Sequence, residues 1–170
     1  RQRVIYLGTL SKVMYPGIRM AYMVLPEDLV DPFVIGNSEL YRGGRMPEQA
    51  ALAEFIDEGY FTAHIKRMRT VYQERRDTLR HEMESRLGDA VSVSGGHAGL
   101  QLLYRFNTPV DDAQISAQSL AEGVVCRPLS MYYADQEFSK PGLNLGFAAV
   151  PVKRLVPAVE TLVRVIERHL

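Results

Sequence analysis

The stretch that most constrains this chain is a polar loop between two short apolar runs. The runs, Val4–Leu7 and Met20–Leu25, are rich in β-branched and aromatic residues, and Gly8 and Pro16-Gly17 interrupt the sequence between them. This pattern predicts two strands joined by a loop, because such runs favour extended backbone, whereas glycine and proline favour turns. The fold must therefore present the polar side chains of this loop at the end of a pair of strands.

The loop carries four side chains whose chemistry fits one kind of ligand. Thr9, Ser11 and Lys12 follow the first strand closely, and Arg19 stands seven residues after the lysine. A lysine amine can form a Schiff base with a carbonyl compound. Hydroxyls and a guanidinium can bind a phosphate, the arginine through paired, charge-assisted donors. The set therefore fits a phosphorylated carbonyl cofactor, although the Ser-Lys dipeptide alone is also compatible with an ordinary exposed loop.

The whole string from Thr9 to Tyr22 resembles the lysine loop of fold-type-I pyridoxal-phosphate proteins, the aspartate aminotransferase superfamily. The resemblance implies that pyridoxal 5'-phosphate is the cofactor and that it is bound as an internal aldimine on Lys12. It also implies that Arg19 binds the phosphate of the cofactor. Thr9 then corresponds to the family's hydroxyl three residues before the lysine, and Ser11 adds a second hydroxyl.

Motifs beyond this loop narrow the resemblance to the MocR-type transcriptional regulators of the GntR class. They cover most of the chain: Pro47–Ile56, Gly59–Phe61, His64–Arg69, Tyr72–Leu79 and Gly142–Ala148. Such regulators join an N-terminal winged-helix DNA-binding domain to an aminotransferase-like domain. The resemblance implies a homodimer that senses a small-molecule amine or amino acid through aldimine exchange at Lys12. It also implies that DNA is bound only through a preceding domain, so we expect a C-terminal fragment of a longer protein.

The order of patterns along the chain predicts an α/β fold. Helical spacing of apolar residues predicts helices at about 26–35, 47–58, 61–87, 113–122 and 155–170. Short apolar runs predict strands at Val91–Val93, Leu100–Arg105, Gly123–Cys126 and Leu143–Phe147. Together with the resemblance, this order implies the C-terminal part of a fold-type-I aminotransferase. We expect the end of the large cofactor-binding domain at 1–58, a connecting helix at 59–88 and a small α/β subdomain at 89–170.

The strand expected at Leu143–Phe147 bears on the ligand. In the family, a strand of the form Leu-Arg-Leu-Ser-Phe often presents an arginine to the substrate carboxylate, whereas this chain has Asn144 at that position. A neutral amide cannot form the bidentate ion pair that a carboxylate favours. Asn144 is therefore a candidate substrate-binding residue, but we expect it to bind a carboxylate less well than the family's arginine does. Arg127, next to the strand expected to end at Cys126, is the nearest substitute in the sequence.

Composition limits the other possibilities. The 170 residues are 46% hydrophobic and carry 20 basic and 20 acidic side chains, so no charge surplus favours direct binding of nucleic acid or anionic lipid. The single cysteine, Cys126, excludes an internal disulfide framework and fits a reducing cytoplasm. No apolar run is long enough for a membrane span, and the histidines show no metal-ligand spacing. The basic stretch Tyr41–Pro47 is either a plain loop or a glycine-rich anion-binding loop.

Three functional hypotheses follow. The first is the pyridoxal-phosphate-binding effector domain of a transcriptional regulator, in which a ligand at Lys12 shifts a conformational equilibrium. The second is an active class I/II aminotransferase, in which Lys12 also moves the α-proton of the substrate as a general base. The third is a scaffold that dimerises without cofactor. Asn144 favours a sensor over a transaminase, and the sequence leaves open whether the protein is an enzyme.

Overall fold

The chain folds into two compact units, and the boundary between them along the sequence falls inside one long helix. The structure, a computed structural model, describes residues 3–170 apart from the side chain of Gln136. One unit is Arg1–Arg67 and the other is Met68–Leu170, and the boundary falls within α3 (Tyr60–Leu87). The expected division into residues 1–58, 59–88 and 89–170 concerns the architecture of a family-length protein and stays a prediction.

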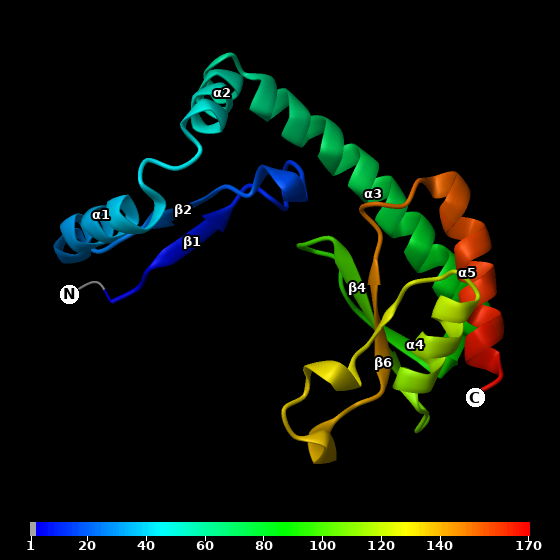
Figure 1. The fold of residues 1–170 in the computed structure, drawn as a ribbon. Helices are drawn as coiled ribbons and strands as arrows, with labels where there is room; N and C mark the ends of the chain where they lie inside the picture. Colours follow the sequence, from blue (N-terminus) through cyan, green and yellow to red (C-terminus); the bar gives the residue numbers. More distant parts are fainter. Residues whose placement is uncertain (1–2) are drawn as a thin grey trace. The chain divides into compact units, whose positions relative to one another are not determined.

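The N-terminal unit is built on a two-stranded antiparallel sheet (Figure 1). β1 (Tyr6–Thr9) pairs with β2 (Ala21–Val24), with Tyr6 opposite Val24 and Thr9 opposite Ala21. The two predicted strands are therefore confirmed, but β1 begins two residues later than the predicted Val4–Leu7 and extends two residues further, to Thr9. A short 3-10 turn, η1 (Pro16–Ile18), lies in the loop between them.

Two helices complete this unit. α1 (Glu27–Tyr41) has acidic residues in its first turn, and α2 (Met46–Asp57) carries Pro47 at its start. α1 does not end near residue 35. It continues through Gly36 and Asn37, because an interior glycine destabilises a helix by only about 1 kcal/mol. The helix ends at Arg42, which adopts the left-handed conformation and donates its backbone N–H to Ser38 O.

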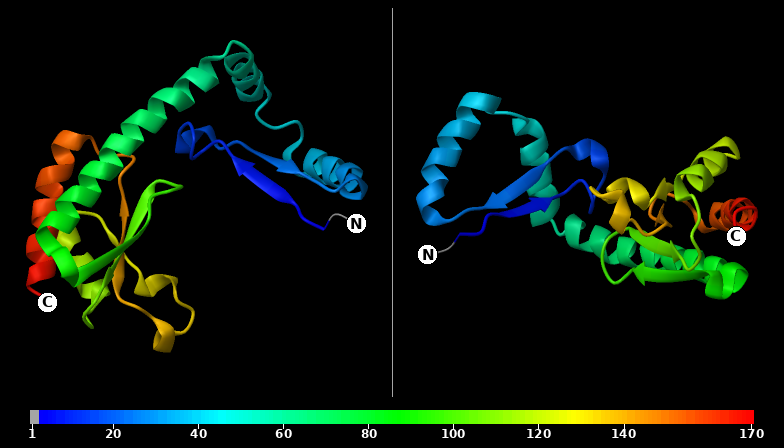
Figure 2. Two further views of the ribbon diagram at one scale, coloured as in Figure 1. Left: turned by 180° about the vertical axis from the view of Figure 1, so that it is seen from behind. Right: turned by 90° about the horizontal axis from the view of Figure 1, so that it is seen from below.

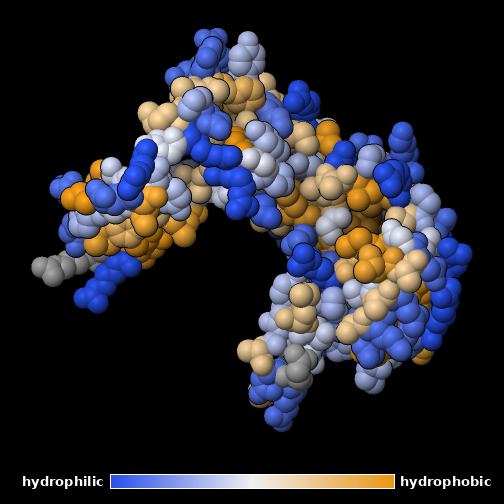
Figure 3. Space-filling model, viewed as in Figure 1, coloured by the Kyte–Doolittle hydropathy of each residue, from blue (hydrophilic) through white to orange (hydrophobic). Residues whose placement is uncertain are grey.

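Much of the apolar surface of the N-terminal unit is exposed. Among residues 3–67, Ile18 is the only large apolar side chain that is buried, and neither α1 nor α2 buries any residue. Figure 3 shows apolar side chains gathered over part of this unit. On α1 the exposed apolar residues are Val30, Phe33, Val34, Ile35, Leu40 and Tyr41. A surface of this kind is typical of a region that another part of a protein or a partner covers.

The C-terminal unit is a four-stranded antiparallel sheet with helices on one face (Figures 1 and 2). The strand order is β3 (Val91–Gly95), β4 (Gln101–Phe106), β6 (Gly142–Gly146), β5 (Arg127–Pro128). α3 packs on the covered face together with α4 (Asp112–Ala121) and α5 (Val152–Glu167). Three 3-10 turns connect these elements: η2 (Gly88–Ala90), η3 (Ser130–Tyr132) and η4 (Gln136–Phe138). No helix in the described part of the chain has both the length and the apolar character needed to cross a bilayer.

Alternation along the strands separates a buried face from an open one. The inward residues of β4 and β6 are buried, whereas their neighbours point to the opposite side, because successive strand side chains alternate between faces. We call this opposite side the open face. Its strand residues are Ser92, Ser94, Gln101, Leu103, Arg105, Arg127 and Asn144. It thus carries two arginines and no carboxylate.

The strand predicted at Gly123–Cys126 is wrong, whereas the other three predicted strands of this unit are present. Gly123 has φ +84°, its N–H donates to Leu120 O, and Val124 N–H donates to Ser119 O at 2.8 Å. These bonds form a helix C-terminal cap with a left-handed glycine. The apolar Val-Val-Cys run therefore leads out of α4, and the strand pairing begins one residue later, at Arg127.

The core of the C-terminal unit lies between the sheet and the helices. Buried residues come from α3, β4, β6 and α5 above all: Leu79, Met83, Leu87, Leu102, Tyr104, Phe106, Leu143, Leu145, Leu155, Val159, Leu162, Val163, Val165 and Ile166. Tyr104 is fully buried, and its hydroxyl has no hydrogen-bond partner within residues 3–170. Burial, and then the nearby Glu84 carboxylate, raise the pKa of Tyr104, so the phenol stays neutral.

Replacing Tyr104 with phenylalanine is expected to leave the free energy of unfolding unchanged or to raise it by up to about 1 kcal/mol. The hydroxyl is desolvated on folding and gains no hydrogen bond, so its removal relieves an unfavourable contribution. Urea denaturation of both proteins measures the difference. Tyr104→Ala is the matched control, and its cavity should destabilise the protein by at least about 3 kcal/mol. A loss above 1 kcal/mol in the phenylalanine variant would show that the hydroxyl has a partner.

Candidate functional site

The residues between the paired strands β1 and β2 form a closed loop. We call residues 9–20 the lysine loop. Leu10 N–H donates to Met20 O at 3.0 Å, which extends the hydrogen bonding of the two strands by one rung beyond the pair Thr9–Ala21. Inside the loop, Met14 N–H donates to Leu10 O at 2.9 Å and closes a single helical turn. Lys12 lies in the middle of this turn.

The four cofactor-binding residues predicted from the sequence all lie on this loop. Lys12 and Arg19 are exposed, Thr9 is exposed at the end of β1, and Ser11 is half-buried. Ser11 N–H donates to Thr9 Oγ1 at 3.3 Å, which fixes the threonine hydroxyl beside the lysine turn. Arg19 adopts the left-handed conformation, with φ 50° and ψ 35°, which is uncommon for a residue other than glycine.

Two side chains from later in the chain hold the lysine loop. Arg45 Nη1 donates to Ile18 O at 2.8 Å, and His64 Nε2 lies 3.0 Å from Val13 O. The sequence placed His64 only within a family motif and Arg45 only within the basic stretch Tyr41–Pro47, and it predicted no contact of either with the lysine loop. These contacts join residues 27 and 51 positions apart. No local pattern could have revealed them, because spacing along one element predicts only contacts within that element.

The two predicted substrate-binding residues are brought together on the open face of the C-terminal unit. Arg127 on β5 lies directly opposite Asn144 on β6. Directly opposite residues of an antiparallel pair point to the same face, with Cβ atoms about 5 Å apart. Asn144 Nδ2 donates to the Tyr132 hydroxyl at 3.4 Å, while Asn144 Oδ1 is buried without a partner among the described residues. Tyr132 lies on η3, near the strand pair, and thus joins the cluster.

A buried carboxylate fixes the segment that carries Tyr132. Asp112, at 3% exposure, accepts hydrogen bonds from Ser130 N at 3.0 Å, Ser130 Oγ at 2.5 Å and Gly142 N at 2.9 Å. These bonds tie both ends of the segment 130–142 to the start of α4. Gly142 is also required by space, since a Cβ there would lie 2.3 Å from Tyr104 O on the neighbouring strand.

The donor set of the lysine loop fits pyridoxal phosphate. An amine can bond the cofactor's carbonyl carbon, and a guanidinium with two hydroxyls matches a phosphate. Within residues 3–170, neither Lys12 nor Arg19 forms an ion pair with a carboxylate, so both cations are available to a ligand. The same described residues contain no group of three His, Cys, Asp or Glu side chains arranged to hold a metal ion.

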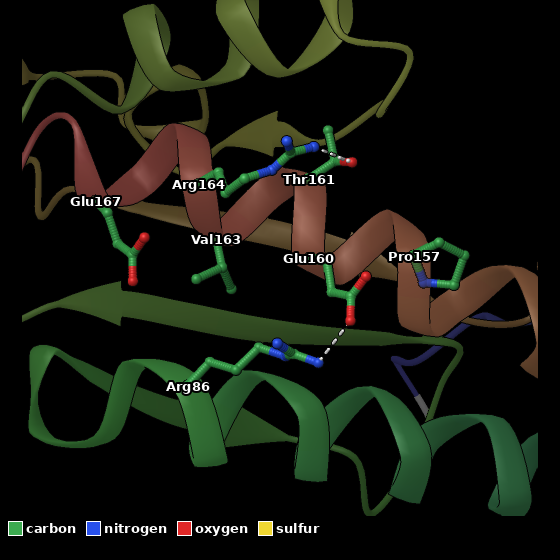
Figure 4. A pocket seen from close by; sticks show the side chains of 7 residues that line it. All are labelled: Arg86, Pro157, Glu160, Thr161, Val163, Arg164 and Glu167. Atoms are coloured by element: carbon green, nitrogen blue, oxygen red, sulfur yellow. Dashed lines mark hydrogen bonds and ion pairs between the residues drawn. The ribbon is translucent and has the colours of Figure 1, made fainter.

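Two cavities on the C-terminal unit contain none of the predicted site residues. A surface pocket of about 710 Å³ lies between α3 and α5 (Figure 4). Its Arg86 is paired with Glu160 at 3.1 Å and with Glu82 at 2.9 Å, so this charge already has partners within the protein. An apolar cavity of about 290 Å³ lies along the first half of α5.

Comparison with known proteins places these observations in a family. Residues 1–162 match the family model described as aminotransferase class I and II. The probable rhizopine catabolism regulatory protein MocR of Rhizobium meliloti is 34% identical over 165 residues, which cover 94% of this chain and 32% of that protein. The uncharacterized HTH-type transcriptional regulator YhdI of Bacillus subtilis is 34% identical over 134 residues, which cover 79% of this chain and 29% of that protein. The chain therefore spans about a third of the length of these relatives.

A solved structure agrees with the fold over nearly the whole chain. Kynurenine aminotransferase of Pyrococcus horikoshii, determined in complex with PMP, superimposes with a TM-score of 0.86 at 25% identity, covering 98% of this chain and 41% of that one. The predicted α/β fold, part of a fold-type-I aminotransferase, is thus confirmed, as is the resemblance to MocR-type regulators. Because the family match and the structural match each extend over almost all of its residues, this protein belongs to the class I and II aminotransferase family.

Proposed function

We propose that this chain is the pyridoxal-phosphate-binding, aminotransferase-like effector domain of a transcriptional regulator, which binds an amine or amino acid at Lys12. The observation that carries the proposal is the lysine loop, which holds an amine, a guanidinium and two hydroxyls, and neither cation has an ion pair within the described residues. The regulator relatives, each 34% identical to this chain, support the regulatory role. The chain covers only about a third of those proteins, so the activity of the whole protein is part of the proposal.

The polar residues of the lysine loop would contact different parts of the cofactor. When bound, pyridoxal phosphate supplies a carbonyl group that condenses with amines and a ring that withdraws electrons from them. Lys12 Nζ would hold the cofactor covalently, as the amine that condenses with its carbonyl group. Arg19 would donate paired hydrogen bonds to the phosphate oxygens, and the hydroxyls of Thr9 and Ser11 would donate to the remaining ones.

The cluster on the open face is the proposed substrate-binding part of the C-terminal unit. Asn144 occupies the position where the family pattern has its arginine, and Arg127 lies directly opposite Asn144 on the neighbouring strand. The Arg127 side chain is exposed and has no ion pair within residues 3–170. Arg127 would therefore supply the positive charge that Asn144 lacks, while the Asn144 amide and the Tyr132 hydroxyl add neutral hydrogen bonds. This arrangement favours an amine that also carries a carboxylate.

The same cluster supports sensing more than turnover. A transaminase must hold the ligand carboxylate in place while Lys12 Nζ takes the α-proton, because a misplacement of about 1 Å can lower the rate on the order of 100-fold. Arg127 is exposed and lies on a strand of two residues at the edge of the sheet. Such an anchor suits binding better than precise positioning. An active class I/II aminotransferase is the second candidate, and the structural match to kynurenine aminotransferase favours it.

The proposed partners follow from the regulator role. A homodimer would cover apolar surface of the N-terminal unit, where α1 buries no residue. DNA would be bound by a separate N-terminal domain, as the HTH-type name of one relative suggests, and a regulator of this kind would act in the bacterial cytoplasm. The buried, unoxidised thiol of Cys126 is compatible with that reducing compartment.

In the full-length protein loaded with pyridoxal phosphate, we expect amino acids to change the cofactor's absorbance with little turnover to the oxo acid. The same ligands should change the affinity for promoter DNA in a mobility-shift assay, since they would favour one of two conformations. Steady-state transamination at about 1 per second or more, which is ordinary for enzymes, would contradict the regulator proposal and favour the aminotransferase.

A matched pair of ligands tests the role of Arg127 in the same assay. The pair is an amino acid and the amine that lacks its carboxylate. Arg127→Met should weaken binding of the amino acid at least about tenfold, because a charge-assisted contact is lost, and should leave binding of the amine nearly unchanged. An equal loss for both ligands would show that Arg127 does not contact the carboxylate.

A further inference from the structure

Two side chains of the N-terminal unit act on the backbone beside the two cations of the lysine loop. His64 contacts Val13 O, which belongs to the residue directly after Lys12. Arg45 contacts Ile18 O, which belongs to the residue directly before Arg19. Each cation of the loop therefore has one neighbouring carbonyl held by a side chain from outside the loop.

The contacts of His64 define the state of its ring. A carbonyl oxygen only accepts hydrogen bonds, so Nε2 must carry the hydrogen that points at Val13 O. Arg67 Nη2 lies 3.3 Å from Nδ1, and a guanidinium only donates, so Nδ1 must be the acceptor. His64 thus makes both contacts only as a neutral ring with its hydrogen on Nε2. Arg67, one turn along α3, orients the ring toward the loop.

The held carbonyls control the peptide planes on which the cations stand. Val13 O and Met14 N–H belong to one planar peptide, which is held on one side by His64 and on the other by Leu10 O at 2.9 Å. The turn around Lys12 is thereby closed. Ile18 O and Arg19 N–H likewise share a plane, so Arg45 fixes the peptide that leads into the left-handed Arg19. That conformation is unfavourable for arginine and persists only when its surroundings hold it.

We infer that His64 and Arg45 are positioning residues of the lysine loop, which set where the Lys12 amine and the Arg19 guanidinium stand. The expected effect of these residues on cofactor binding rests on the proposed function, whereas their expected effect on the loop does not. Neither side chain bonds the cofactor; each acts through the backbone. Loss of either contact loosens the loop, and the cofactor must then order it again on binding, which lowers affinity.

Hydrogen exchange tests the effect on the loop in the cofactor-free, full-length protein. In His64→Ala and Arg45→Met, amides in the peptide covering residues 10–20 should exchange about five- to tenfold faster, the factor expected for losing one such hydrogen bond. Peptides from β4 and β6 should be unchanged. His64→Gln should restore slow exchange, because its amide can donate to Val13 O and accept from Arg67. His81→Ala on the same helix and Arg42→Met are the matched controls, since neither side chain has a hydrogen bond or ion pair within residues 3–170.

Cofactor titration of the same variants tests the consequence for binding. The Kd for pyridoxal phosphate should rise about five- to tenfold in His64→Ala and Arg45→Met and return toward the original value in His64→Gln. Unchanged exchange in the 10–20 peptide, or a glutamine variant that behaves like alanine, would overturn the inference. Faster exchange in a protein that binds no pyridoxal phosphate at all would instead refute the proposed function and leave the positioning role standing. If His64→Ala does not fold, His64→Gln and Arg45→Met still decide the outcome.

Discussion

Replacing Lys12 with alanine is expected to abolish covalent attachment of pyridoxal phosphate to the full-length protein. Lys12 lies in the middle of the closed turn, exposed and without an ion pair among the described residues. Of the other lysines in this chain, only Lys66 belongs to the N-terminal unit, and it lies on α3. Reduction with borohydride, followed by mass spectrometry of the peptide covering residues 10–20, should detect the adduct in the original protein and none in the variant.

Two further variants separate attachment from affinity. Lys66→Ala is the matched control and should leave the adduct intact. Arg19→Ala should weaken the affinity for the cofactor while the adduct still forms, because it removes donors to the phosphate and not the nucleophile. An adduct that persists in Lys12→Ala would refute the assignment of the lysine. Equal cofactor affinity with and without the Arg19 guanidinium would refute the assignment of the phosphate contact.

Replacing Asp112 with alanine is expected to lower the free energy of unfolding by about 3–4 kcal/mol. The carboxylate is buried and accepts three hydrogen bonds, from Ser130 N, Ser130 Oγ and Gly142 N. Truncation removes all three acceptor contacts and leaves the buried Gly142 N–H without a partner, which adds a desolvation penalty to the lost bonds. Urea denaturation of the two proteins measures the difference.

The asparagine variant shows how much of this effect is hydrogen bonding. Asp112→Asn can keep its oxygen toward the two backbone N–H groups, and the Ser130 hydroxyl can reverse to accept from the new –NH2. We therefore expect a smaller loss, of about 1 kcal/mol. Asp89→Ala, at an exposed position, is the matched control and should change stability by no more than about 0.5 kcal/mol. A loss below 1 kcal/mol in Asp112→Ala would show that the segment 130–142 is held by other contacts.

The sequence predicted those features whose residues lie close together along the chain. The lysine loop is one example, because Thr9, Ser11, Lys12 and Arg19 all fall between two strands that the apolar pattern reveals. The predicted helix 113–122 is another, since Asp111 caps it, with Gln114 N–H donating to the Asp111 carboxylate at 2.9 Å. Such elements depend on the spacing of residues that are close in the sequence, and this spacing can be read directly from the sequence.

Features that depend on distant partners could not be predicted in the same way. Asp112 lies at the start of α4 next to the capping residue Asp111, but it turns inward to partners 18 and 30 residues away. The pairing of Arg127 with Asn144 depends on the register of β5 and β6. A strand of two residues has too short a sequence pattern for this register to be predicted. Proximity in the sequence suggested Arg127 as a substitute cation, whereas strand register is what puts it opposite Asn144.

The hydrogen bonds of Asp112 have a consequence for how this family member can diverge. Ser130 and Gly142 are structurally constrained. Ser130 donates two hydrogen bonds to the Asp112 carboxylate, and Gly142 has no room for a side chain. Between them, most of the described side chains from 131 to 141 are exposed, so few contacts limit their replacement. Lengthening such a loop is entropically mild, at roughly 0.6 kcal/mol per doubling. New ligand preferences can therefore evolve by insertion or exchange within this segment while the strands on either side keep their register.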